Sequence, residues 1–156
     1  MDSLWLNAAF YQASRALGNT GKNPPVGCII VKSNQVVGMG HTSLNGRPHA
    51  EEVALNSLIG DPKGGTAVIT LEPCAHKNNN TLPCAQLIIN AGIKHVVIPI
   101  LDPDIRTNGK GVKLLRKSGI KVSIGSNKKE AFDLNYGFYS RNKFNRPLVS
   151  LKMATS

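Results

Sequence analysis

The chain has 156 residues, of which 41% are hydrophobic and 18% charged, and this composition is typical of one soluble globular domain. No apolar run approaches the roughly 18 residues that a membrane-spanning helix needs, and the first residues lack the basic start of a signal peptide. Nineteen Lys and Arg against nine Asp and Glu give a net charge of +10, which favours anionic partners, whether phosphorylated metabolites or nucleic acids.

The first third of the chain predicts a helix followed by a hairpin. Apolar residues recur at helical spacing from Leu4 to Leu17, so we expect a helix that is capped by Asp2 or Ser3 and ends near Gly18. Glycine and proline then predict a loop over residues 21–25. Two apolar segments joined by turn residues predict the strands of a hairpin, at residues 26–31 and 35–40.

From residue 49 onward, helical and strand patterns alternate. Helices are expected at residues 49–58, 83–91, 112–117 and 127–142. Strands are expected at residues 66–71, 96–100 and 121–124. Because apolar strands separated by helices indicate a sheet covered on both faces, we expect an α/β fold with three α/β/α layers. Its central sheet should be mixed and contain about five strands.

Three short segments contain the residues with the clearest chemistry: His49-Ala50-Glu51, Pro73-Cys74 and Pro83-Cys84. One imidazole and two thiols provide three protein ligands for zinc and leave the fourth tetrahedral position for water, as in catalytic zinc sites. Glu51 can move protons without binding the metal. The arrangement resembles the signature of zinc deaminases, in which His-x-Glu is followed by Pro-Cys and a second cysteine. We therefore predict one Zn²⁺ per chain, bound by His49, Cys74 and Cys84, with Glu51 as the catalytic proton shuttle.

The predicted elements bring these residues to one place. Ligands of such sheets bind at the carboxyl ends of the strands, and Cys74 follows the strand expected at residues 66–71. Pro73 and Pro83 are each placed at the start of a helix, where the helix dipole favours a thiolate. His49 opens its own helix, so Glu51 lies in the same first turn.

Other polar residues are expected to have structural roles. Cys28 lies in an apolar strand and is predicted to belong to the core, and Glu52 is expected on the surface. For Glu72 we expect either support of the metal site or capping of backbone groups. Three cysteines, an odd number, are a poor disulfide framework, so we predict a cytoplasmic location.

The segments around these motifs resemble the deaminase domain of the bifunctional riboflavin-biosynthesis deaminase/reductase, the RibD family. The resemblance extends over residues 23–27, 46–51, 70–76, 81–85, 89–94, 102–104, 108–111, 134–138, 146–147 and 151–154. Nine residues separate Cys74 from Cys84, and this long interval is similar to that of the RibD family, whereas other zinc deaminases usually have close-spaced cysteines. The chain departs from the family within this interval, at residues 77–80.

This resemblance implies a cytidine deaminase-like fold and a zinc hydrolase that acts on a cyclic amidine. The implied reaction converts 2,5-diamino-6-(5-phosphoribosylamino)pyrimidin-4-one to 5-amino-6-(5-phosphoribosylamino)uracil and ammonia, a step of riboflavin biosynthesis. It also implies substrate contacts from Asn23, His76, Thr81, Asp104 and Asn108. In addition, Arg106 or Lys110 is expected to meet the substrate phosphate.

The resemblance also implies a domain organisation and partners. Residues 1–145 are expected to form the zinc-dependent deaminase domain, and residues 146–156 a C-terminal tail that resembles the start of that family's reductase domain. Because the chain stops at Ser156, we expect no NADPH binding and a separate reductase in the pathway. We further expect a homodimer that binds a phosphorylated pyrimidine and neither membranes nor nucleic acid.

Two alternatives remain open. A tRNA adenosine deaminase, or another nucleoside or nucleotide deaminase, would share the zinc chemistry and suit the positive charge, although its cysteines would be close-spaced. The second alternative is an inactive zinc-binding remnant of a truncated bifunctional enzyme. Steep salt dependence of nucleic-acid binding would identify the first, and absence of turnover the second.

Overall fold

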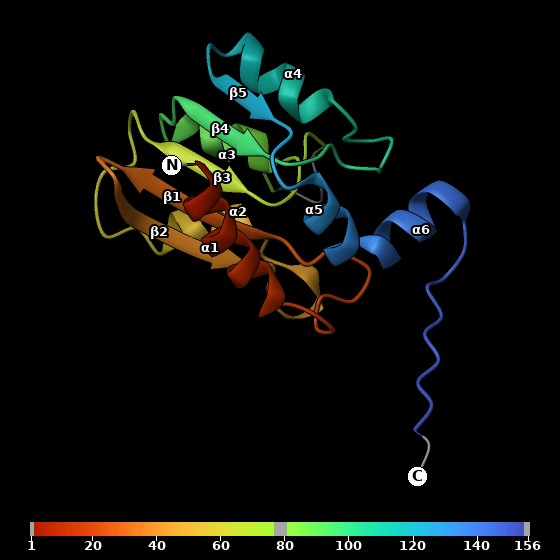
Figure 1. Ribbon diagram of the computed structural model, residues 1–156. Helices are drawn as coiled ribbons and strands as arrows, with labels where there is room; N and C mark the ends of the chain where they lie inside the picture. Colours follow the sequence, from red (N-terminus) through yellow and green to blue (C-terminus); the bar gives the residue numbers. More distant parts are fainter. Residues whose placement is uncertain (1, 77–80, 155–156) are drawn as a thin grey trace.

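The centre of the molecule is a five-stranded sheet with the strand order β2-β1-β3-β4-β5. The computed structural model describes residues 2–76 and 81–154. Its strands are β1 (Gly27–Lys32), β2 (Gln35–His41), β3 (Thr66–Ile69), β4 (His95–Ile98) and β5 (Lys121–Ile124). Strand β1 pairs antiparallel with both β2 and β3, whereas β3, β4 and β5 are parallel (Figure 1). The expected mixed sheet and hairpin are therefore confirmed.

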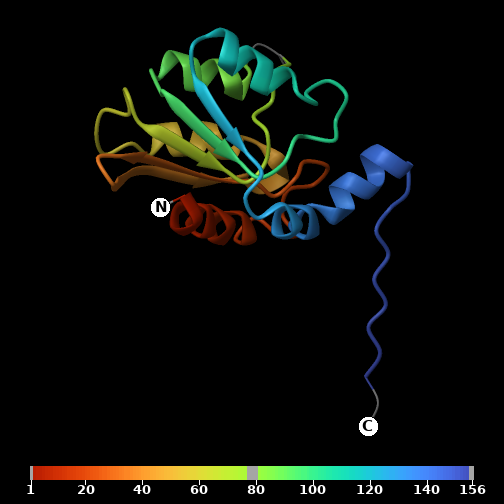
Figure 2. The same cartoon turned by 45° about the horizontal axis from the view of Figure 1, so that its top comes forward.

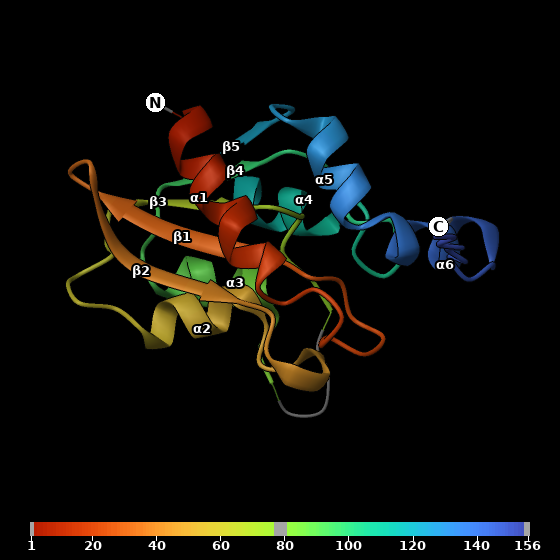
Figure 3. The same cartoon turned by 60° about the horizontal axis from the view of Figure 1, so that its bottom comes forward.

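Helices cover both faces of this sheet. The helices of the chain are α1 (Asp2–Ser14), α2 (Ala50–Asn56), α3 (Cys84–Asn90), α4 (Lys110–Lys117), α5 (Lys128–Leu134) and α6 (Tyr136–Phe144), with a short 3₁₀ turn at Leu44–Gly46. Helices α1 and α5 lie on one face, and α2, α3 and α4 lie on the other (Figures 2 and 3). The predicted α/β/α sandwich is confirmed. None of the helices in the described part of the chain is long and apolar enough to cross a membrane.

The apolar strands fill two cores because successive side chains point to opposite faces of the sheet. In β1, Ile29 and Val31 join the cluster under α1 and α5, whereas Cys28 and Ile30 join the cluster under α2, α3 and α4. Cys28 is 1% exposed. Its predicted place in the core is confirmed.

Two helix predictions were wrong at their boundaries. Helix α1 ends at Ser14 and not near Gly18, because the amides of residues 15–17 donate to carbonyls three residues back and form turns. The single helix expected over 127–142 is two helices that meet at Asn135. The backbone there is non-helical (φ −105°, ψ 15°), and the side-chain amide of Asn135 donates to the backbone carbonyl of Ala131. Helix α6 therefore leaves the axis of α5 and extends from the edge of the sandwich (Figure 1).

The residues after β3 also differ from the expectation. Strand β3 ends at Ile69, and residues 72–75 form an irregular segment, so Pro73 starts no helix. Pro83, in contrast, directly precedes α3. This leaves Cys74 on a loop and Cys84 on a helix, both close to the carboxyl-terminal end of the parallel strands.

Candidate metal centre and active site

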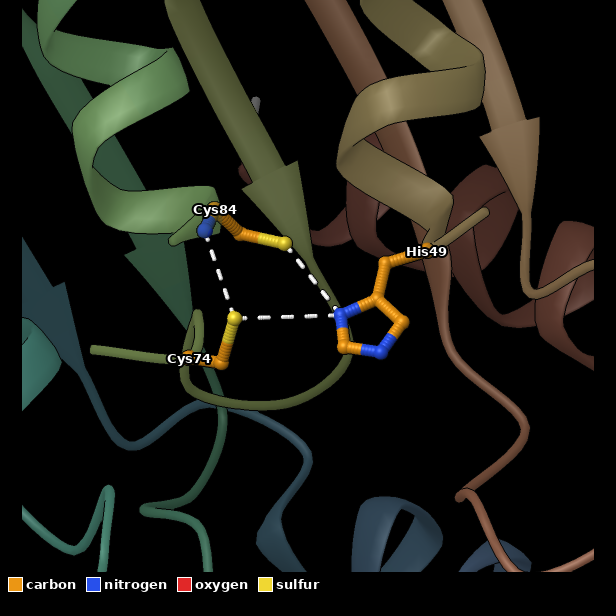
Figure 4. A group of neighbouring side chains, drawn as sticks. All are labelled: His49, Cys74 and Cys84. Atoms are coloured by element: carbon orange, nitrogen blue, oxygen red, sulfur yellow. Dashed lines mark hydrogen bonds between the residues drawn. The ribbon is translucent and has the colours of Figure 1, made fainter. Parts of the chain in front are cut away.

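His49, Cys74 and Cys84 converge beside the end of β3 (Figure 4). His49 immediately precedes α2, and Cys84 is the first residue of α3. The His49 Nδ1 atom lies 3.3 Å from the Cys84 Sγ atom and 3.8 Å from the Cys74 Sγ atom, and the three ligand atoms lie within 4.8 Å of one another. Zinc–nitrogen and zinc–sulfur bonds place the ligand atoms of a tetrahedral site about 3.6 to 3.8 Å apart. The cluster therefore fits one zinc ion.

Hydrogen bonds favour the thiolate form of one of the two cysteines, and the thiolate is the form that binds a metal. The Cys84 backbone amide donates to the Cys74 sulfur at 3.2 Å. Hydrogen bonding from the Cys84 thiol, and then from His49, lowers the pKa of the Cys74 thiol, whereas hydrogen bonding to Cys74 and burial raise the pKa of Cys84. Because thiolates and imidazoles are the ligands that zinc prefers in proteins, this donor set suits zinc better than magnesium or calcium.

Glu51 lies next to this cluster, in the first turn of α2. Its side chain is 4% exposed, and burial raises the pKa of its carboxyl group to about 7. A carboxyl group of that pKa both accepts and releases a proton near neutral pH, as a general acid–base must. Glu52 is half-buried and does not belong to the described residues that line the adjacent cavity.

A cavity of about 230 Å³ opens beside the cluster. His49, Glu51 and Cys74 form its metal side. The remaining wall comes from the segment before β1, the segment between β2 and α2, the loops after β3 and β4, and α6. Cys84 is buried behind this wall and is absent from the described lining.

Three of the five expected substrate contacts line the cavity: Asn23, His76 and Asp104. The Asn23 carbonyl accepts a hydrogen bond from the Thr20 hydroxyl at 2.7 Å. Gly46 allows the Asn23 side chain to lie against the backbone of residue 46. A Cβ atom at this position would be 2.0 Å from the side-chain amide nitrogen of Asn23. The His76 ring contacts the buried Thr107 hydroxyl at 3.2 Å.

The other two expected contacts, Thr81 and Asn108, are not among the described residues that line the cavity. The Thr81 hydroxyl accepts a 3.5 Å hydrogen bond from Arg47, which does line it. The side-chain amide of Asn108 donates to the backbone carbonyl of Asp102 at 2.7 Å. Both residues therefore form a hydrogen bond with a residue that lines the cavity. The departure from the family at residues 77–80 lies outside the described residues.

Glu72 holds the loop after β4 against the loop that carries Cys74. One carboxylate oxygen accepts hydrogen bonds from the amides of Asp102 and Gly109, and the other from the amide of Val112. The start of α4 also packs closely here, since a Cβ atom at Gly111 would lie 2.1 Å from the Pro73 carbonyl oxygen. Of the two roles expected for Glu72, the structure confirms capping of backbone groups.

We expect Glu72→Ala to destabilise the fold by roughly 3 to 5 kcal/mol, because it leaves three backbone amides without their acceptor. Glu72→Gln should cost less, since one carbonyl oxygen remains. Chemical denaturation measures both values. As a control, Glu130→Ala removes an exposed carboxylate with one hydrogen bond, from Asn127, and should change stability by less than about 0.5 kcal/mol. Equal losses in Glu72→Ala and Glu130→Ala would contradict this role.

Several cavity residues were missed by the sequence analysis. Asp102 is 8% exposed, and burial raises the pKa of its carboxyl group to about 7. Arg47 stands two residues before His49, but a single arginine there carries no recognisable signal. Phe138, Arg141 and Asn142 come from α6, whose approach to the cavity depends on the break at Asn135.

The expected phosphate contacts are also placed differently. Arg106 lines the cavity, but its guanidinium group is paired with the Asp104 carboxylate. Lys110 is exposed, and its ammonium group donates to the Ile105 carbonyl at 3.0 Å. Lys110 is not among the described residues that line the cavity.

The chain is similar to a protein family and to several known proteins. Residues 1–100 match the family model of the cytidine and deoxycytidylate deaminase zinc-binding region. The riboflavin biosynthesis protein RibD of Aquifex aeolicus is 41% identical over 154 residues, which cover 99% of this chain and 43% of that protein. A diaminohydroxyphosphoribosylamino-pyrimidine deaminase of Buchnera aphidicola subsp. Schizaphis graminum is 43% identical over 146 residues, which cover 94% of this chain and 99% of that protein.

A solved structure is similar over most of the chain. It is a diaminohydroxyphosphoribosylaminopyrimidine deaminase/5-amino-6-(5-phosphoribosylamino)uracil reductase from Thermotoga maritima. The TM-score is 0.89 at 37% identity, and the match covers 94% of this chain and 42% of that one. The chain therefore spans less than half the length of the RibD relatives and nearly the whole length of the Buchnera protein.

Proposed function

Because the chain belongs to the cytidine and deoxycytidylate deaminase zinc-binding family, we propose that it removes an amino group from a pyrimidine ring by hydrolysis. The observation that carries this proposal is the meeting of His49, Cys74 and Cys84 with the buried Glu51 at one cavity. The names of the Buchnera and Thermotoga relatives support 2,5-diamino-6-(5-phosphoribosylamino)pyrimidin-4-one as the substrate. The products are then 5-amino-6-(5-phosphoribosylamino)uracil and ammonia.

The mechanism assigns proton transfer to Glu51. Zinc bound by His49, Cys74 and Cys84 would supply a Lewis acid that makes water nucleophilic at neutral pH. The Glu51 carboxylate accepts one proton from the attacking water and passes it to the ring nitrogen. It then carries the second proton to the departing amino group, so that water and the amine become a carbonyl and ammonia. Burial suits Glu51 to both steps, because its pKa of about 7 lies near neutral pH.

The cavity wall orients the ring. We propose that Asn23, His76 and Asp104 contact the substrate directly, since all three line the cavity. Thr81 and Asn108 then act through Arg47 and Asp102, with which they form hydrogen bonds. Pairing with Arg106 lowers the pKa of Asp104, so this carboxyl group is ionised and accepts hydrogen bonds from amino groups of the ring.

We also propose the domain bounds, the cellular compartment and the oligomeric state of the protein. Residues 1–145 would form the deaminase unit, and the exposed residues 146–154, which contain no helix or strand, support a boundary near residue 145. The free thiols of Cys28, Cys74 and Cys84 support a reducing compartment such as the cytoplasm. Exposed apolar side chains on α1, Leu4 and Tyr11, are compatible with a homodimer.

The test is ammonia release by the purified, zinc-loaded protein. With the pyrimidine ribotide we expect one ammonia for each uracil product formed. Transfer RNA, supplied in parallel, should remain unchanged. Deamination of the RNA without turnover of the ribotide would instead support a nucleic-acid deaminase. Zinc binding without ammonia release from either compound would support the inactive remnant.

A further inference from the structure

Four cationic side chains line the cavity: Lys22, Arg47, Arg106 and Arg141. They differ in whether a carboxylate already balances their charge. Both carboxylate oxygens of Asp104 accept hydrogen bonds from the Arg106 guanidinium group, including two of 3.0 Å from its Nε atom. In the part of the chain that the structure describes, no carboxylate forms an ion pair with the other three cations. The uncompensated charge of the cavity therefore lies on Lys22, Arg47 and Arg141.

The Arg141 guanidinium group is held in place at this rim. Its carbon atom lies 5.5 Å from the centre of the Phe138 ring, and one terminal nitrogen donates to the Lys22 carbonyl at 2.6 Å. An arginine side chain has five N–H donors, so one hydrogen bond to a carbonyl leaves donors for a second acceptor. This arrangement fixes the direction of a planar group that matches phosphate oxygens in pairs.

Helix α6, which carries Arg141, is itself attached to the sandwich. The Tyr139 hydroxyl donates to the Leu101 carbonyl, and Phe138 and Tyr139 pack against the core cluster under α2, α3 and α4. The Lys22 carbonyl belongs to the segment just before Asn23, so the Arg141 hydrogen bond joins α6 to a proposed substrate-contact segment. The Arg141 guanidinium group is therefore fixed relative to the Lys22 backbone and to the cavity.

From this geometry we infer that Arg141, with Lys22 and Arg47, forms an anion site that binds the phosphomonoester of a ribose 5-phosphate group. Arg106 is excluded from this role because Asp104 neutralises it. The inference rests on the proposed function for the identity of the substrate, and it specifies which residues distinguish a ribotide from a riboside. Arg141 is the main determinant, since its guanidinium group is the one oriented by both a ring and a backbone carbonyl.

The test compares Arg141→Gln with Arg141→Lys and with Lys143→Gln. Lys143 is an exposed cation on the same helix, outside the described lining of the cavity, and its replacement removes the same charge. Calorimetry would measure the binding of ribose 5-phosphate and of ribose. We expect Arg141→Gln to weaken ribose 5-phosphate binding roughly 10- to 100-fold. Arg141→Lys should recover part of this loss, and Lys143→Gln should bind as the unaltered protein does.

A second measurement uses turnover. In Arg141→Gln, kcat/KM for the pyrimidine ribotide should fall by a similar factor, whereas kcat/KM for the dephosphorylated riboside should stay constant. Loss of ribose 5-phosphate affinity in Arg141→Gln supports the anion site even if the ribotide is not turned over, and then only the proposed function fails. Unchanged affinity in Arg141→Gln, or equal losses in Arg141→Gln and Lys143→Gln, would overturn the inference.

Discussion

Glu51→Gln is expected to lower kcat by about 10²- to 10⁴-fold while the protein retains its zinc. The amide has nearly the shape of the carboxyl group, so His49, Cys74 and Cys84 keep their positions, but it cannot accept and release the proton of water. Because Glu51 is buried at the cavity, bulk water has little access to replace it. The measurement pairs ammonia release with metal analysis of the same sample.

The adjacent residue gives a matched control for this substitution. Glu52→Gln removes the same charge one position further along α2, from a side chain outside the described cavity lining. We expect its kcat to stay within about two-fold of the unaltered protein, because Glu52 is not among the described residues that line the cavity. Loss of zinc in Glu51→Gln would show that this carboxylate supports the metal and does not serve only as a proton shuttle.

Cys84→Ala is expected to abolish both stoichiometric zinc binding and turnover. It removes one of three protein ligands and leaves a pair, His49 and Cys74, that cannot complete a catalytic zinc site. Metal analysis after dialysis should fall from about one zinc per chain to well below that. The remaining activity should be lower than that of Glu51→Gln, because the nucleophile is no longer generated.

Cys28→Ala provides the control for loss of a thiol. Cys28 is buried in the core on β1 and does not belong to the metal cluster found among the described residues. The substitution should lower thermal stability because it leaves a small cavity. Zinc content should nevertheless stay near one per chain. Retention of full zinc occupancy in Cys84→Ala would contradict the assigned ligand set.

The metal cluster could be predicted from the sequence because His49 and Cys84 lie at the starts of well-marked helices and Cys74 lies on the loop after a well-marked strand. Periodicity placed His49 at the start of a helix and Cys84 after Pro83, and both positions agree with the structure. Near-continuous apolar segments predicted the strands and, through them, the edge of the sheet where the ligands meet. These patterns are local in the sequence, so they can be recognised without any knowledge of tertiary contacts.

The cationic side of the cavity depends on long-range contacts and left no such signal. Asn135 breaks a segment whose pattern is helical throughout, and only after this break does Arg141 reach the Lys22 carbonyl, 119 residues away in the chain. Arg106 shows the opposite error. Its sequence position suggested a phosphate contact, but the neighbouring Asp104 binds its guanidinium group. Pairing between charged side chains cannot be read from their order alone.

The reactive groups and the cavity rim lie on different segments of the chain. This separation affects how such a protein can change during evolution. His49, Glu51 and Cys84 are fixed by helices packed on the sheet, whereas Asn23 and Asp104 lie on connecting loops and Arg141 on the helix that extends from the sandwich. Loops accept substitutions and changes in length more readily than packed elements do. Descendants of such a scaffold can therefore acquire new substrates by altering the rim, while the inherited chemistry of hydrolysis stays intact.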